Sequence, residues 1–138
     1  MTGALDMKVG AACLRFFGPD LDPAELEAKL GSPPSNSWNA SEAWLDGDQL
    51  SLRGHKGWIL NGDWSQGQPL EDQIDTLLGA LNPDLEVWTS LTARHHADIF
   101  CGVFLGGRVG SSIWPARTLQ AVSARGLSLN LCIFDASQ

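Results

Sequence analysis

The chain has few of the residues from which specialised sites are usually built. It contains three cysteines in 138 residues, and Cys13, Cys101 and Cys132 are widely spaced in apolar runs without a C-x-x-C pair. Such cysteines are typical of reduced core thiols, which argues against a disulfide framework and a cysteine metal site. The glycine-rich segment 106–112 lacks the Gly-Lys-Ser/Thr of a P-loop and the G-x-G-x-x-G spacing, so neither nucleotide motif is present.

Positive charge and long apolar runs are also scarce. Nine Lys and Arg residues stand against 16 Asp and Glu residues, which gives a net charge of -7 without a basic run. Because phosphate-backbone binding relies on clustered Lys and Arg, a nucleic-acid role is disfavoured, whereas a basic protein partner fits the charge. No signal-peptide pattern opens the chain, and no stretch approaches membrane-spanning length. We expect a cytoplasmic protein that binds no membrane.

What remains is the composition of a globular domain. The apolar share is 43% and the charged share is 18%, away from the range of disordered chains. The length is close to the commonest domain size, at which most of the surface of the unfolded chain is buried on folding. We predict a single domain over residues 1–138, with residues 1–7 as a short tail.

The clearest local signal is a short helix from Asp22 to Leu30. Asp22 stands at the N-cap, Pro23 at the first helical position, and Glu25 completes a D-x-x-E capping box. Gly31 follows the last turn, where a left-handed conformation is needed. This segment predicts a helix and contains no catalytic or ligand-binding motif.

Two further helices are predicted. The helix from about Pro69 to Leu81 has one apolar stripe, formed by Leu70, Ile74, Leu77, Leu78 and Leu81. Asn82-Pro83 ends it. The third helix begins near Pro115, has Leu119 and Val122 on one face, and ends at Gly126.

Alternating apolar runs between these helices predict strands. The candidates are Lys8–Phe17, Gln49–Arg53, Gly57–Asn61, Asp84–Thr92, Ala97–Leu105 and Leu127–Ile133. The second and third would form one hairpin, and the fourth and fifth another, with Arg94-His95-His96 in its turn. Residues 32–43 and 106–112 are predicted loops. The expected fold is α+β, with a mostly antiparallel sheet, three helices packed on one face, the order β-α-β-β-α-β-β-α-β, and a partly ferredoxin-like arrangement.

The order of these segments is similar to that of a known family. Leu14 to Pro23 (LRFFGPDLDP), Leu30 to Pro34 (LGSPP), Gly57 to Leu60 (GWIL) and Leu70 to Ile74 (LEDQI) resemble a bacterial family called domain of unknown function 4279. The resemblance covers Lys8 to Asp135. None of these segments is a chemical motif, so the resemblance implies no activity, cofactor or catalytic residue.

Six tryptophans and no tyrosine make the aromatic content unusual. Trp58 and Trp88 lie in predicted strands and are expected in the core. The others lie in or beside turn-rich segments and either fold back over the core or contact a partner. The partner-binding hypothesis names Trp38, Trp44, Trp64 and Trp114.

Two weaker hypotheses concern ions. His96 and Asp98 would share one face of a strand and could ligate a metal, or else belong to an ordinary polar turn with His95. The loop before the third helix could hold an anion, or else be a plain connection. The residues named for the anion are Arg108, Gly110, Ser111 and Ser112.

Catalytic groups are harder to assign. Cys13 or Cys101 could be a nucleophile activated by His55 or His96, but apolar neighbours favour structural burial for both cysteines. No catalytic residue and no cofactor is predicted.

Three functions stay open. The favoured hypothesis is a small acidic binding protein, in one form an immunity-type antidote that occludes a basic toxin. The second is an enzyme or sensor for a small ligand, with Asp63, His55, His96 and Asp98 as the polar groups of a loop-lined pocket. The third is a structural homo-oligomer that pairs through a sheet edge or its tryptophans.

Overall fold

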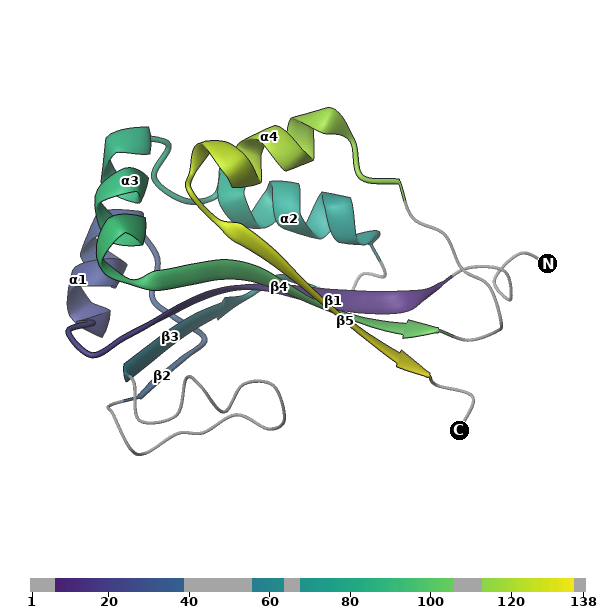
Figure 1. The fold of residues 1–138 in the computed structure, drawn as a ribbon, viewed down its shortest axis with the longest axis horizontal. Helices are drawn as coiled ribbons and strands as arrows, with labels where there is room; N and C mark the ends of the chain where they lie inside the picture. Colours follow the sequence, from purple (N-terminus) through teal and green to yellow (C-terminus); the bar gives the residue numbers. More distant parts are fainter. Residues whose placement is uncertain (1–6, 39–55, 64–67, 106–112, 136–138) are drawn as a thin grey trace.

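A five-stranded sheet forms the centre of the molecule (Figure 1). The structure is a computed structural model that describes residues 7–38, 56–63, 68–105 and 113–135. The elements are β1 (Met7–Gly18), α1 (Pro23–Leu30), β2 (Asn36–Trp38), β3 (Lys56–Asn61), α2 (Leu70–Gly79), α3 (Leu85–Arg94), β4 (His96–Leu105), α4 (Ala116–Ala124) and β5 (Ser128–Asp135). The strand order is β2-β3-β1-β4-β5, in which only β4 and β5 pair in parallel.

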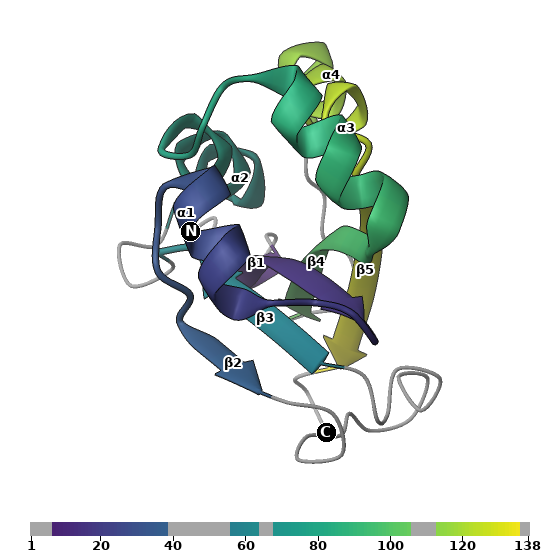
Figure 2. The ribbon, with the colours of Figure 1, turned by 90° about the vertical axis from the view of Figure 1, so that its left-hand side faces the viewer.

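The four described helices cover one face of the sheet, as Figures 1 and 2 show from two directions. Between the helices and this helix-side face lies the core, where Phe16, Trp58 and Trp88 are fully buried. The rings of Phe16 and Trp58 meet edge to face, with centroids 5.9 Å apart. Burial of large apolar surface is the main favourable term in folding, so this layer stabilises the fold.

The α+β class is confirmed, whereas the predicted architecture is wrong. In the part of the chain that the structure describes, the sheet is mixed and carries four helices instead of three. The predicted strand Asp84–Thr92 is helix α3, so the order of elements differs and no hairpin turn exists at Arg94-His95-His96. The ferredoxin-like description does not fit the whole sheet, because β5 is added beside β4 and parallel to it.

Helix α1 has the predicted ends. The backbone N–H of Ala24 donates to the Asp22 carboxylate at 3.0 Å, and Gly31 takes φ 87° after the last turn. The capping box is incomplete, because the Glu25 carboxylate turns instead to Lys29 and, in α3, to Arg94. These two hydrogen-bonded cations lower the pKa of Glu25.

Helix α2 packs its predicted apolar stripe against the sheet; Leu70, Ile74, Leu77 and Leu78 are buried. Its one buried polar residue, Gln73, completes β1 where the register of that strand is irregular. The Gln73 amide accepts from the backbone N–H of Ala12 at 3.0 Å and donates to the carbonyl of Gly10 at 2.9 Å. Backbone groups that the strand ladder leaves without partners are thereby satisfied.

Helix α3 forms because its capping residue and the helical spacing of its buried side chains outweigh the β-branched residues, which favour a strand. The backbone N–H of Glu86 donates to the Asp84 carboxylate at 3.0 Å, which caps the first turn. Trp88 and Leu91, three residues apart, form the buried face. The Trp88 indole N–H also donates to the carbonyl of Asn82 at 2.7 Å.

Two smaller expectations also need correction. Residues 36–38 lie in a predicted loop but form the edge strand β2, because the backbone pairs with β3. In α4, Val122 is buried as expected, whereas Leu119 is 46% exposed and Thr118 is buried instead. The Thr118 hydroxyl donates to Asp75 of α2 at 2.8 Å, so a polar contact between the two helices determines which face of α4 is buried. The predicted strand at 49–53 lies outside the described residues.

Candidate functional site

Several predicted site residues lie outside the described part of the chain. They are Trp44, His55, Trp64, Arg108, Gly110, Ser111 and Ser112. The structure therefore leaves the anion-binding hypothesis and half of the tryptophan hypothesis as predictions.

The two tryptophans of that hypothesis that the structure describes do not come together. Trp38 of β2 lies beside Phe17, which points away from the core. Trp114, just before α4, packs against the core on the helix side. The sheet separates these two indoles, so they do not share one surface.

Alternation along β1 divides its side chains between two environments. Leu14 and Phe16 enter the core, so Cys13, Arg15 and Phe17 point to the opposite face. We call this opposite side the distal face. Its central residues are Cys13, Arg15, Phe17, Trp38, Gly57, His96, Asp98 and Phe100.

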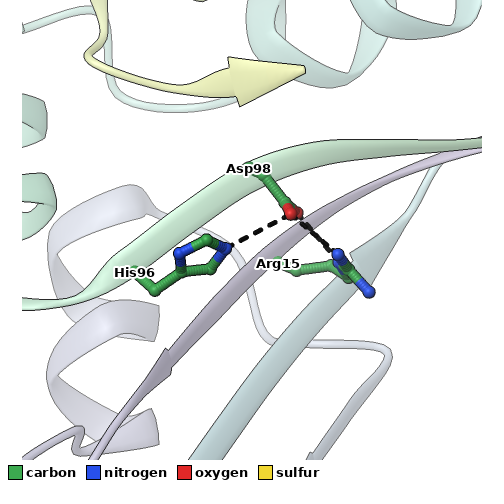
Figure 3. Close-up of polar contacts among 3 residues, drawn as sticks. All are labelled: Arg15, His96 and Asp98. Atoms are coloured by element: carbon green, nitrogen blue, oxygen red, sulfur yellow. Dashed lines mark hydrogen bonds and ion pairs between the residues drawn. The ribbon is translucent and has the colours of Figure 1, made fainter. Parts of the chain in front are cut away.

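An ion pair lies at the centre of the distal face (Figure 3). Arg15 Nε donates to Asp98 Oδ1 at 2.8 Å, and Arg15 Nη2 donates to Asp98 Oδ2 at 2.7 Å. The side chains are only 5% and 2% exposed. A bidentate geometry of this kind fixes both groups in direction as well as in distance.

His96 completes this cluster from the solvent side. Its Nε2 lies 3.4 Å from Asp98 Oδ2, and its side chain is 49% exposed. Figure 3 shows the Asp98 carboxylate between the imidazole and the guanidinium. His96 and Asp98 thus lie on one face of β4, as their spacing predicts, while Arg15 comes from the neighbouring strand.

Aromatic rings surround the ion pair. The Arg15 guanidinium lies 4.4 Å from the centroid of Phe100 and 5.2 Å from that of Phe17. Phe17 in turn has ring contacts with Trp38 at 5.8 Å and His96 at 6.1 Å. Cation–π contacts of a desolvated guanidinium are favourable, so charge and rings hold one another in place.

Trp38 can lie over β3 because residue 57 is glycine. The two residues are paired in the sheet, and a Cβ at Gly57 would overlap the six-membered ring of the Trp38 indole. Absence of a side chain at this position therefore lets the indole approach the strand and reach Phe17.

The cysteines of this region are not activated. Burial raises the pKa of Cys13 to about 11, although the charge of Arg15 opposes the change. Burial also raises the pKa of Cys101 to about 12. Since the thiolate is the nucleophilic form, both thiols are protonated and poorly reactive at neutral pH.

His95 differs from its neighbour His96 in burial and in contacts. It is 6% exposed, it faces Gly18 at the end of β1, and neither of its ring nitrogens has a hydrogen-bond partner among the described residues. Burial, and then the charge of Arg94, lower the pKa of His95. Burial of an imidazole in this way disfavours its charged form.

Of the polar groups proposed for an enzyme, His96 and Asp98 lie together, Asp63 lies apart from them, and His55 is outside the described residues. Asp63 follows Asn61, which pairs with Cys13, whereas His96 pairs with Phe17 four residues further along β1. At about 3.3 Å per residue, these positions are about 13 Å apart along the strand. Within the described ranges, no three His, Cys, Asp or Glu side chains gather as a metal site requires.

Arg15 and Phe17 are the site residues that sequence reasoning missed. The available signal was a charged residue inside the alternating apolar strand 8–17, matched by Asp98 inside another apolar strand. Two opposite charges of this kind are rarely buried unless they pair. Their pairing depends on a register across 83 residues, which the local pattern does not contain.

Comparison with models of protein families shows to which family the chain belongs. The model of the family described as Domain of unknown function (DUF4279) matches residues 7–136, nearly the whole chain. The chain belongs to the DUF4279 family. This membership confirms the resemblance found in the sequence, and the family description assigns no activity. Comparisons with curated proteins and with solved structures gave no match.

None of the helices in the described part of the chain has the length and apolar character that a bilayer span requires.

Proposed function

We propose that this DUF4279 chain is a non-catalytic binding protein whose distal face contacts a basic protein partner. The observation that carries the proposal is the half-exposed His96, which contacts the buried Phe17, whose ring also contacts Trp38, beside an ion pair with bidentate geometry. Rings with few rotatable bonds, fixed before binding, lose little conformational entropy on contact. Such aromatic groups are typical of the residues that dominate binding energy.

The ion pair supports binding more than chemistry. Removing two charges from water is expensive, so a buried pair adds little net stability over apolar residues of similar size. On the distal face the pair instead fixes the rings that it contacts, Phe17 and Phe100. The protonated Cys13 thiol nearby offers no nucleophile.

Charge supports a basic partner. The chain carries a net charge of -7, which accelerates the approach of a positively charged protein. An Arg or Lys side chain of that partner can stack on an aromatic ring such as the Trp38 indole. The immunity-type form of the proposal makes the partner a basic toxin enzyme, which the chain inactivates by covering its active site.

The test is binding to purified basic proteins, measured by calorimetry, with toxin domains among the candidates. For the protein that binds, His96→Ala is expected to weaken affinity at least about tenfold, or 1.4 kcal/mol. Leu119→Ala is the matched control, because Leu119 has a similar exposed fraction and lies on the helix side. It should leave affinity unchanged.

Two outcomes contradict the proposal. If no basic protein binds at micromolar concentration, a basic partner is wrong. If a basic protein binds but His96→Ala and Leu119→Ala behave alike, the distal face is not the interface. For the immunity-type form, the wild-type chain should also inhibit the toxin enzyme in a one-to-one complex.

A further inference from the structure

The outer edge of β5 is the second unusual surface of the molecule. β5 is the last strand of the sheet and pairs with β4 alone among the described strands. Figures 1 and 2 place no other described element along its outer side. The backbone N–H and C=O groups on that side can therefore accept another strand.

The side chains of β5 are apolar on the helix-side face although none of the described helices buries them. Leu129, Leu131 and Ile133 pair with Ile99, Cys101 and Val103, which are all in the core. Yet the three β5 residues are 41%, 48% and 56% exposed. The apolar layer of the core thus continues onto the edge strand, where it meets solvent.

We propose that β5 pairs antiparallel with β5 of a second copy of this chain. A two-fold axis at Leu131 would place each Leu131 beside the other and each Leu129 opposite Ile133 of the second copy. On the helix-side face, Leu129, Leu131 and Ile133 of each copy then each meet an apolar side chain of the other copy. Self-complementarity of this kind is what an interface between identical chains requires.

Charge favours a second copy at this edge in spite of the acidity of the chain. Residues 128–133 contain no charged side chain, so two copies with a net charge of -7 can approach here without close like-charge contacts. The same segment lacks the lysine or proline with which natural sheets protect an edge from pairing.

The first test is the mass of the full-length chain in solution, measured by light scattering over a range of concentrations. We expect a dimer that dissociates on dilution. Leu131→Lys should give a monomer, because two ammonium groups would meet at the axis. Leu85→Lys is the matched control, since Leu85 has a similar exposed fraction of 45% but belongs to α3 and not to β5, and it should leave the dimer intact.

The second test fixes the register and does not depend on the stability of a lysine variant. Across antiparallel strands, facing residues are close enough for a disulfide. Under mild oxidation Leu131→Cys should therefore form a covalent dimer, whereas Leu129→Cys, which faces Ile133 of the other copy, should form far less. Circular dichroism checks that each variant is folded.

Any of three results would overturn the dimer: a wild-type monomer at the highest soluble concentration, equal masses for Leu131→Lys and Leu85→Lys, or equal cross-linking of the two cysteine variants. A wild-type monomer that pairs its β5 edge with a strand of another protein would show that the occupant is not a second copy. These results are independent of calorimetry on the distal face, so the two proposals fail separately.

Discussion

The two faces of the sheet are built in opposite ways from the same strands. On β1, Phe16 packs among Trp58 and Trp88 on the helix side, while the next residue, Phe17, packs against an arginine and two surface rings. Both phenylalanines are fully buried. The helix-side face gains stability from apolar area, whereas the distal face uses costly charges to fix the orientation of a few side chains. Burial alone therefore does not tell the core from the distal face.

The largest expected effect is on the helix-side face. Phe16→Ala should lower the free energy of unfolding by about 4 kcal/mol, because it leaves a cavity between two tryptophans. Urea denaturation followed by circular dichroism measures this loss. A loss below about 1 kcal/mol would mean that this layer is not the main source of stability.

The next effect tests the cost of the ion pair. Arg15→Met leaves Asp98 buried without its cation and should lower the free energy of unfolding by about 3 kcal/mol. The double variant Arg15→Met with Asp98→Leu should return to within about 1 kcal/mol of wild type, because no charge then remains buried. If the double variant is as unstable as the single one, the pair itself stabilises the fold and the contrast between the faces is lost.

The buried His95 makes the stability of the fold depend on pH. Because burial lowers the pKa of His95 below its ordinary value of 6.5, the unfolded chain binds more protons than the folded chain just below pH 6.5. The contribution of His95 to the free energy of unfolding is therefore fully present above that pH. It is lost as the pH drops from 6.5 toward the lowered pKa. Glu25 acts separately, since its pKa is lowered from 4.5 and its contribution is lost only in more acid solution.

His95→Gln should flatten the fall in stability below pH 6.5. Urea titrations at a series of pH values between 7 and 5 give the slopes for the wild type and the variant. An unchanged slope in His95→Gln would show that another group causes the acid sensitivity.

The smallest expected effect is that of His96 on folding. Since its side chain is half-exposed, His96→Ala should change the free energy of unfolding by no more than about 0.5 kcal/mol. Thermal unfolding gives this value, which is the control for the binding test with the same variant. A loss of several kcal/mol would place His96 among the structural residues.

The sequence predicted those elements whose signals are local. The capping residue Asp22, the left-handed Gly31 and the stripe of α2 each act within a few residues, and the structure confirms them. The local pattern predicts a strand in place of helix α3, because Asn82-Pro83 indicates only the end of the preceding helix. The residue that follows, Asp84, caps the next helix.

The candidate site was only half predictable, because its two halves depend on different information. The shared face of His96 and Asp98 follows from their spacing on a strand. Arg15 joins them only through the pairing of β1 with β4, which the whole sheet determines. Likewise, Trp38 was a candidate by composition, but its neighbours Phe17 and Gly57 come from two other strands.

Because a Cβ at position 57 would overlap the indole of Trp38, substitutions at these two positions are coupled during evolution. A family member with alanine or a larger residue in place of Gly57 must move or shrink the residue that pairs with it. Sequences related to this chain should therefore vary at the two positions jointly, with glycine retained wherever tryptophan is.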